Sequence, residues 1–228
     1  MMDVVKQSRP ARHQARVLLL CAAFLLPGLC GCRFFVAVGK MVMGEPQLTS
    51  SFEQTTGVNL SESGDRVLII CTAPHNILVD FPSVQLELMD RISHHLENRD
   101  IHVVSADDVA AWYDDQGEWG DYTELAEHFN ARYVMHLTLR TFSYLEPQSS
   151  HLMRGRCEGT VKVYEIDEEG SIPVRKSFER NLHVKFPEIH PVPRESKSDS
   201  IFVENLLNRV SLQSSQMFYD HRMSDTIY

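Results

Sequence analysis

Apolar residues follow two different periods along this chain, and the change of period marks its predicted elements. Residues 67–71 form a continuous apolar run between Gly64-Asp65 and Pro74, which predicts a central strand covered on both faces. Apolar positions then recur every three or four residues from Pro82 to about Asn98, which predicts an amphipathic helix. Residues 101–104 are short and apolar, and we expect a second strand there.

Two capping signals follow. Ser105 precedes Asp108 by three residues and Asp121 precedes Glu124 by three, a spacing that predicts the start of one short helix after each. From Ala131 the period becomes two, and apolar positions alternate with polar ones in residues 132–186. This alternation predicts an antiparallel meander of three strands.

A closing helix is predicted after Ser198-Asp199, which supply a cap. Its expected inner face is apolar at helical spacing: Val203, Leu206, Leu207, Val210, Met217 and Phe218. The predicted order is β-α-β-α-α-β-β-β-α. It indicates an α/β fold with a mixed sheet in a two-layer sandwich.

The length of 228 residues and a hydrophobic content of 43% suit one buried core. We expect it within residues 66–222, followed by a tail over 223–228. Residues 47–65 are rich in Ser, Thr and Glu, which predicts a tether or loosely packed lead-in. With the apolar segment before them they complete a predicted lipidated linker over residues 32–65.

The amino terminus has the pattern of an export signal. Four basic side chains and one acidic side chain precede Val17, and an apolar run then extends to Cys32. The run has about sixteen residues, fewer than the roughly twenty that span a bilayer. Residues 1–31 are therefore predicted to be a cleaved signal peptide. An uncleaved anchor helix and a plain secretory peptide are the alternatives.

The sequence Leu29-Cys30-Gly31-Cys32 resembles the lipobox of bacterial lipoproteins. This resemblance implies that Cys32 is acylated, with palmitate-type chains, and becomes the first residue of the mature chain. Arg33 follows in place of Asp, which by the same resemblance implies the outer membrane. The apolar residues 34–43, which include Phe34 and Phe35, are candidates for contact with headgroups or a partner, and packing on the domain is the equal alternative.

Two further resemblances concern the folded part. The element order, with Arg66-Val-Leu-Ile-Ile and Ala131-Arg-Tyr-Val-Met, resembles the α/β domain of the amino-terminal module of the Tol propeller protein and of curli-secretion-type envelope lipoproteins. Residues 154–164 and Phe218-Tyr-Asp-His221 look like an uncharacterised family of predicted bacterial lipoproteins. The first resemblance implies a periplasmic module assembled with partners, and the second implies no activity.

The charge excludes a nucleic-acid partner. The chain has 22 basic and 31 acidic side chains, and removal of residues 1–31 changes the formal charge from −9 to −12. Binding to phosphates needs a basic face. The only dense basic cluster lies in the signal peptide, so we expect lipid rather than charge to hold the domain at a membrane.

Candidate chemistry is sparse. Cys71 ends the first strand and His75 follows four residues later, where open α/β sheets place ligands. No acid is positioned to orient His75, and no helix begins close enough to activate the thiol. A buried structural cysteine is the favoured interpretation. Cys71 and Cys157 could pair in an oxidising compartment or remain as two reduced core residues.

No metal or cofactor is expected. The eleven histidines include no His-x-x-x-His pair, and residues 114–121 lack the alternating oxygen ligands of a calcium loop. Trp112, Tyr113 and Trp119 flank that loop. If exposed they would suit a partner-binding rim, although core packing is the default for such aromatics.

These observations predict a non-enzymatic, lipid-anchored module that faces the periplasm and binds another envelope protein. Two alternatives stay open: an envelope enzyme with a Cys71/His75 site, and a structural lipoprotein that spaces or seals the envelope.

Overall fold

A mixed sheet forms one layer of the domain, and two long helices form the second layer on one of its faces. The computed structural model describes residues 47–117, 121–167 and 174–226, which belong to one compact unit. The strand order is β2-β3-β4-β5, with β2 parallel to β3 and the later pairs antiparallel. The strands are β2 (Val67–Thr72), β3 (Tyr133–Leu145), β4 (Leu152–Ile166) and β5 (Val174–Phe186). The predicted α/β sandwich with a mixed sheet is confirmed.

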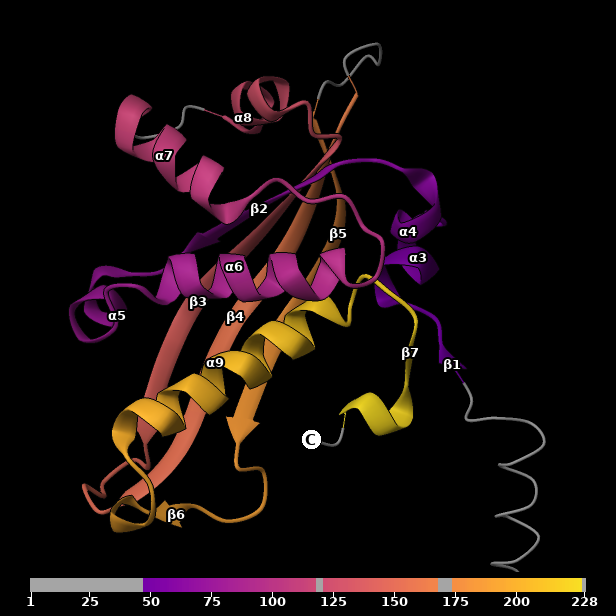
Figure 1. Cartoon of the computed structure of the whole chain (residues 1–228). Coiled ribbons are helices and arrows are strands. Elements are labelled where there is room, and N and C mark those ends of the chain that lie inside the picture. Colours follow the sequence, from indigo (N-terminus) through magenta and orange to yellow (C-terminus); the bar gives the residue numbers. More distant parts are fainter. Residues whose placement is uncertain (1–46, 118–120, 168–173, 227–228) are drawn as a thin grey trace, which may run out of the picture. The chain divides into compact units, whose positions relative to one another are not determined.

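Helices α6 (Val84–Glu97) and α9 (Asp199–Ser215) cross one face of this sheet side by side (Figure 1). Alternate residues of a strand point to opposite faces. On β3 the buried series Tyr133, Met135, Leu137 and Leu139 therefore shares this covered face. The face is closely packed: a Cβ on Gly155 would lie 2.6 Å from a methyl carbon of Leu206 in α9, so the leucine side chain would have to shift.

Strand β2 lies at the edge of the sheet, so the prediction of a central strand is wrong. The continuous apolar run reflects cover on both faces and does not report the number of neighbouring strands. Residues 101–104, predicted as a strand, form only an isolated bridge to this edge between Val67 and Val103. The Val67 amide donates to the His102 carbonyl at 2.8 Å, and the Val104 amide donates to the Val67 carbonyl at 3.0 Å.

Three shorter helices lie in the chain between the parallel strands β2 and β3. Helix α7 (Ala106–Gln116) and helix α8 (Tyr122–Phe129) begin where the capping signals predicted. Helix α5 (His75–Asp80) has no counterpart among the predicted elements. The closing helix ends at Ser215, so Met217 and Phe218 lie beyond it rather than on its inner face.

Residues 47–65 are part of the folded unit, which corrects the prediction of a tether up to residue 65. They form β1 (Gln47–Leu48), α3 (Ser51–Thr56) and α4 (Leu60–Ser63). Phe52 is 0% exposed and Leu60 is 1% exposed. The polar composition misled the prediction because only Phe52 and Leu60 of this stretch are fully buried, each placed by a capped helical turn, while Val58 packs partly buried against the same core.

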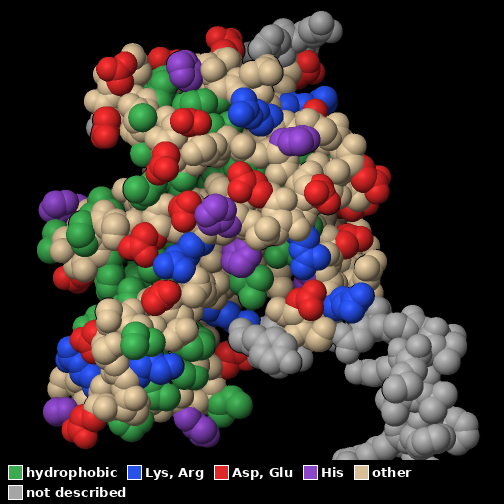
Figure 2. Space-filling model, viewed as in Figure 1, with side chains coloured by type: hydrophobic (Ala, Val, Ile, Leu, Met, Phe, Trp, Pro, Cys, Tyr) green, Lys and Arg blue, Asp and Glu red, His purple; other side chains and the backbone are tan. Residues whose placement is uncertain are grey.

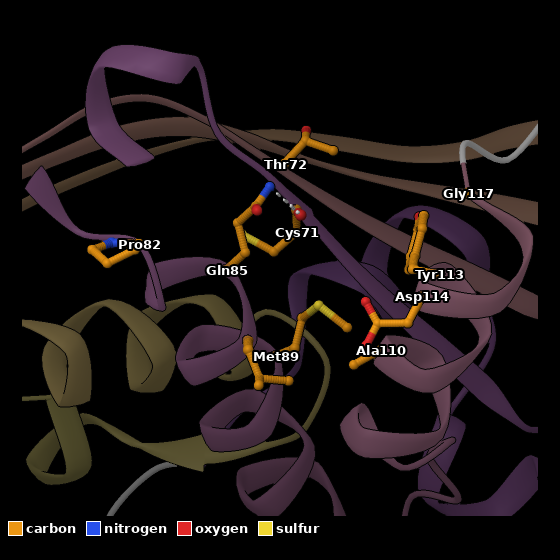
Figure 3. A pocket seen from close by; sticks show the side chains of 10 residues that line it. Cys71, Thr72, Pro82, Gln85, Met89, Ala110, Tyr113, Asp114 and Gly117 are labelled. Atoms are coloured by element: carbon orange, nitrogen blue, oxygen red, sulfur yellow. Dashed lines mark hydrogen bonds between the residues drawn. The ribbon is translucent and has the colours of Figure 1, made fainter. Parts of the chain in front are cut away.

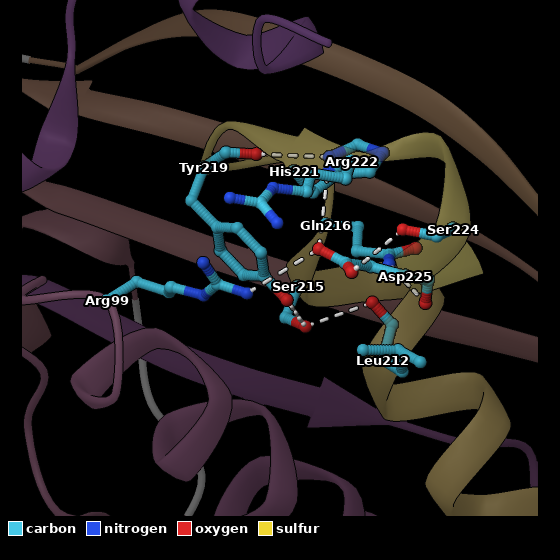
Figure 4. Close-up of polar contacts among 9 residues, drawn as sticks. All are labelled: Arg99, Leu212, Ser215, Gln216, Tyr219, His221, Arg222, Ser224 and Asp225. Carbon is cyan, nitrogen blue, oxygen red and sulfur yellow. Dashed lines mark hydrogen bonds and ion pairs between the residues drawn. The ribbon is translucent and has the colours of Figure 1, made fainter. Parts of the chain in front are cut away.

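The carboxyl-terminal segment fixes this lead-in. Strand β7 (His221–Arg222) pairs with β1, and the Phe52 amide donates to the Met217 carbonyl at 2.9 Å. Figure 4 shows how the segment returns on itself. The Arg222 amide donates to an Asp225 carboxylate oxygen at 3.1 Å, and the Arg99 guanidinium lies 4.7 Å from the Tyr219 ring centre. Residues up to Asp225 are thus fixed by contacts, although a free tail was predicted from 223.

The surface carries acidic and basic side chains interspersed over the visible face (Figure 2). It is hollowed on the left of that view, between the lobe formed by α7 and the lobe formed by α5 and the start of α6. Two of the exposed large apolar side chains lie on the second lobe, Val79 at 66% and Leu86 at 41% exposure.

Candidate functional site

The hollow contains a cavity of about 660 Å³ at the carboxyl end of β2. Its walls come from the amino-terminal half of α6 and the carboxyl-terminal half of α7, and Figure 3 shows side chains of both helices pointing into the space between them. Open α/β sheets bind ligands at the carboxyl ends of parallel strands. The volume lies within the range of roughly 300–1,000 Å³ that small-molecule sites occupy.

The cavity has a mainly apolar wall with a few polar groups. The apolar contributors are Cys71, Pro82, Leu86, Met89 and Ala110. The polar contributors are Thr72, Gln85, Tyr113 and Asp114. Asp114 is the one charged side chain among the described lining residues, and it is exposed at the rim. This composition is typical of a site that binds an apolar body and orients it with few hydrogen bonds.

Tyr113 is the unusual member of this set. Its hydroxyl oxygen is buried and has no hydrogen-bond partner within the part of the chain that the structure describes. Burial raises the pKa of Tyr113 to about 12, so the hydroxyl keeps its proton and remains a donor at neutral pH. A buried polar group without a partner costs free energy. The oxygen is shielded from the cavity as well as from bulk water, so it is not a donor for a ligand there.

The other polar groups at the end of β2 are already paired. The Gln85 amide nitrogen donates to the Cys71 carbonyl at 3.1 Å, which joins α6 to the strand (Figure 3). The Thr72 hydroxyl lies 2.8 Å from Nε2 of His136. Gln85 retains its side-chain carbonyl oxygen as an acceptor.

His136 organises the face of the sheet opposite to α6 and α9. Its Nδ1 lies 2.8 Å from the Tyr122 hydroxyl, and its Nε2 lies 3.3 Å from the Thr138 hydroxyl in addition to Thr72. The Tyr122 ring stacks on Tyr164 with centroids 4.0 Å apart. Burial, and secondarily Lys162, lowers the pKa of His136 below its ordinary value. We conclude that a neutral imidazole holds α8 on the sheet.

Cys71 and His75 do not form a nucleophile and base. The Cys71 thiol is 5% exposed, and burial, with a smaller contribution from Cys157, raises its pKa far above the ordinary value. A reactive thiol needs the opposite shift. His75 is exposed and begins α5, so the expectation that no helix begins close to Cys71 is wrong, although burial still raises the pKa of the thiol.

Cys71 and Cys157 are both free and buried. β3 lies between their strands and the two residues are not in register, so their backbones are separated by more than two strand spacings, that is, by more than about 9.5 Å. A disulfide needs Cα atoms closer than about 7 Å. Of the two alternatives that the sequence left open, the structure has the reduced pair.

Of the predicted partner-binding residues, Trp112 alone lies in the described part of the chain. Trp112 is 9% exposed and packs edge-on against Tyr113 at 5.6 Å between ring centroids. This corrects its place in the candidate rim, because its apolar area is already used in the core. Trp119, Phe34, Phe35 and the lipidation candidate Cys32 lie outside the described residues.

Metal sites and membrane-spanning helices are absent from the described part of the chain. Within residues 47–117, 121–167 and 174–226, no cluster of three or more His, Cys, Asp or Glu side chains could hold a metal ion. In the same ranges, no helix has the length and hydropathy needed to cross a bilayer.

No protein-family model matches this chain. No curated protein matches its sequence either.

Several solved structures are similar to the chain in part. The lipoprotein GNA1162 from Neisseria meningitidis aligns with a TM-score of 0.37 and 10% identity, over 64% of this chain and 98% of that one. The PelC dodecamer from Paraburkholderia phytofirmans gives 0.36 and 13%, over 76% and 96%. The hypothetical protein CT253 from Chlamydia trachomatis gives 0.39 and 12%, over 68% and 98%. TM-scores below 0.5 at such identities assign neither a family nor a function.

Sequence reasoning offered Tyr113 as a rim residue but did not predict the cavity or the burial of its hydroxyl. Tyr113 follows Trp112 in a helix that the capping signal predicted, but nothing in the spacing shows that its hydroxyl is left without a partner. Gln85 was placed on the predicted helix without a role. The available signal was positional: the carboxyl end of the first strand is where the cavity lies.

Proposed function

We propose that this protein is an exported, lipid-anchored component of a bacterial envelope whose folded domain binds a partner or ligand and does not catalyse a reaction. The observation that supports the proposed lipid anchor is a sequence pattern at the amino terminus: basic residues, then a short apolar run, then Leu29-Cys30-Gly31-Cys32. Acyl chains contribute about 0.8 kcal/mol per buried methylene, so several on Cys32 would anchor the chain without a spanning helix.

The chemistry of the domain supports binding over catalysis. A nucleophile at the strand end would need a lowered pKa or an adjacent base. The thiol of Cys71 instead has a raised pKa and is 5% exposed. The hydroxyl of Tyr113 is held protonated. The cavity offers apolar contact and hydrogen bonding, which are the means of recognition.

We further propose that the domain faces the periplasm and that its lipid anchor lies in the outer membrane. Export places the domain on the periplasmic side, and Arg33, by its resemblance to lipoproteins without the Asp retention signal, favours the outer membrane. The domain reaches its partner through residues 32–46, and the first segment of this linker, 34–43, is the candidate for contact with headgroups or the partner.

The test of the anchor is a pair of substitutions. Cys32→Ser removes the acylated thiol, and Cys30→Ser is the matched control at the neighbouring cysteine. We expect Cys32→Ser to leave a larger, unprocessed chain without acyl chains, while Cys30→Ser gives the wild-type size and membrane fraction. Wild-type size and membrane association for Cys32→Ser would contradict the anchor.

The test of the binding role is chemical cross-linking in intact cells, followed by purification of the tagged chain from gently solubilised membranes. We expect the chain to be recovered in a cross-linked complex of defined mass. Recovery of the chain only as an uncross-linked monomer, across several cross-linker lengths, would contradict a protein partner.

A further inference from the structure

The face of the sheet opposite to α6 and α9 indicates which partner the domain binds. We propose that this face docks the lobe formed by α7 and α8 of a second copy of the chain. The inference rests on the proposed binding role, which it makes more specific, and it does not depend on acylation of Cys32.

The described helices leave most of this face bare. Helix α8 packs on β3 and β4 from this side, where Tyr122 lies beside His136 and stacks on Tyr164. Beyond α8, the side chains that β3, β4 and β5 present on this face are mostly polar and are exposed or half-exposed, among them Thr160 and Asn181. A polar surface of this kind suits a protein partner better than an apolar ligand.

The bare face is basic, although the chain as a whole is acidic. Strand alternation, the pairing register and the ion pairs of Glu146 place six basic and three acidic side chains on it. The basic side chains are Arg140, Arg154, Arg156, Lys162, Lys176 and Lys185, and the acidic ones are Glu146, Glu158 and Glu179. The face therefore has the opposite sign to the domain that carries it.

Three of these cations, Arg140, Lys162 and Lys185, form no ion pair with any described residue, whereas Arg156 is held by Glu146 at 2.7 Å. Lys185 lies directly opposite Arg156 in the strand register. Like charges at directly opposite positions of two strands repel each other. A carboxylate brought to this pair from outside would offset that repulsion.

A hollow of about 430 Å³ at the edge of β5 contains the pair of Arg156 and Lys185. Of the two carboxylates that line it, Glu188 is held by Arg209 at 3.0 Å, which leaves Glu158 against the two cations. The hollow therefore has room and charge for an acidic side chain of a partner.

The same chain carries the complementary surface. Helices α7 and α8 contain no Lys or Arg, and their acidic side chains are all exposed. These side chains are Asp107, Asp108, Asp114, Asp115, Glu124 and Glu127. The rings of Trp112 and His128 lie 6.2 Å apart between centroids, so the two helices form one acidic lobe. Clustered charges of one sign repel, and the basic face of a second copy would offset that repulsion.

Charge favours a second copy over a membrane as the occupant. Anionic headgroups would attract the basic face, but they would repel the acidic helix α8 that borders it. Single exposed ion pairs are weak. We therefore expect reversible association that weakens at least about tenfold between roughly 0.05 M and 0.5 M salt, as the charges are screened.

Reversal of charge on the full-length chain in detergent tests the contact. We expect Lys162→Glu with Lys185→Glu to weaken self-association at least about tenfold, as measured by sedimentation equilibrium at matched detergent density. Asp114→Lys with Asp115→Lys should do the same, and an equimolar mixture of the two double variants should recover the wild-type mass. Lysine suits the carboxyl-terminal end of α7, where these aspartates lie, so the helix should be kept.

The matched control is Glu62→Lys with Glu204→Lys, which makes the same change of charge at exposed positions of α4 and α9. Mixed with the reversed face, it should not recover the wild-type mass. Recovery by this control would show an effect of net charge alone, and a wild type that stays a single chain at about 0.05 M salt would overturn the proposal.

Photo-cross-linking in intact cells identifies the occupant. A photoreactive residue replaces Asn181, which is exposed and uncharged on the basic face. We expect an adduct between two differently tagged copies, joined to a peptide from residues 106–129. An adduct only with phospholipid would assign the face to a membrane and overturn the proposal. An adduct only with another protein would also overturn it, but would leave the proposed binding role in place.

Discussion

The ring of Phe52 packs against the ring of Phe218, with centroids 5.6 Å apart. These residues lie near opposite ends of the folded unit, and both also contact Phe178 of β5. The first helical turn after the linker and the segment after the last helix therefore share one aromatic cluster. The first and last segments of the folded unit therefore pack against each other and against β5.

Phe52→Ala should destabilise the domain strongly. Removal of a fully buried phenylalanine costs about 3–5 kcal/mol in the free energy of unfolding, and denaturant unfolding measures it. Gln54→Ala is the control, because Gln54 is exposed on the same helix. A loss below about 1 kcal/mol for Phe52→Ala would show that residues 47–65 do not belong to the core.

Gly159→Ala should destabilise β4. A Cβ at this position would lie 2.5 Å from the Thr138 carbonyl oxygen, so backbone has to move to admit it. Overpacking of this kind costs about 1–3 kcal/mol. Thermal unfolding compares the variant with Thr160→Ala, the next residue along the strand. Equal midpoints of thermal unfolding for the two variants would show that β3 and β4 move apart at this position without loss of stability.

Much of this fold follows from periodicity, and the exceptions have physical causes. The meander was predictable because one covered face imposes strict alternation on Met135, Leu137 and Leu139. The edge position of β2 was not, since burial of both faces of Val67–Thr72 gives the same apolar run in any position. The role of Phe52 was hidden because it is one apolar residue in a polar stretch, and its partner Phe218 lies far away in the sequence.

The candidate site was less predictable than the fold. Its location followed from the rule that ligands lie at the carboxyl ends of parallel strands, and Cys71 was correctly placed there. Its chemistry did not follow, because whether a hydroxyl such as that of Tyr113 has a partner depends on the packing of two helices. Trp112, which the sequence offered as a rim, is buried in the core beside Tyr113.

Stability should decrease as the pH falls from 7 toward 5. The pKa of His136 in the folded chain lies below its value in the unfolded chain, about 6.5. Between these two values the unfolded chain binds a proton that the folded chain does not. The free energy of unfolding therefore falls as the pH drops through the pKa of the unfolded chain.

His136→Gln should flatten this dependence while it lowers stability at pH 7. Burial also lowers the pKa of His95, with contributions from His94, Arg91 and Arg99, so His95→Gln should remove a second part of the slope. Urea midpoints at several pH values measure both effects. A slope unchanged in the double variant would assign the acid sensitivity to other groups.

The thiols of Cys71 and Cys157 should be inert in the folded chain. Burial, with a smaller effect of Glu158, raises the pKa of Cys157 to about 12, and burial likewise raises that of Cys71. Iodoacetamide should modify both only after denaturation, in equal yield with and without prior reduction. Peptide mass spectrometry separates them from the cysteines of residues 1–32. Rapid modification of Cys71 in native protein would restore the enzyme alternative, and a yield that depends on reduction would indicate a disulfide.

The mass of the mature amino-terminal peptide tests the central claim most directly. The protein is extracted from membranes, freed of non-covalent lipid and digested with a protease. The account predicts a peptide that begins at Cys32 and carries a diacylglyceryl group together with an amide-linked acyl chain or a free amine. A peptide that begins at Met1 or Met2, or a chain that begins elsewhere with an unmodified Cys32, would contradict the account.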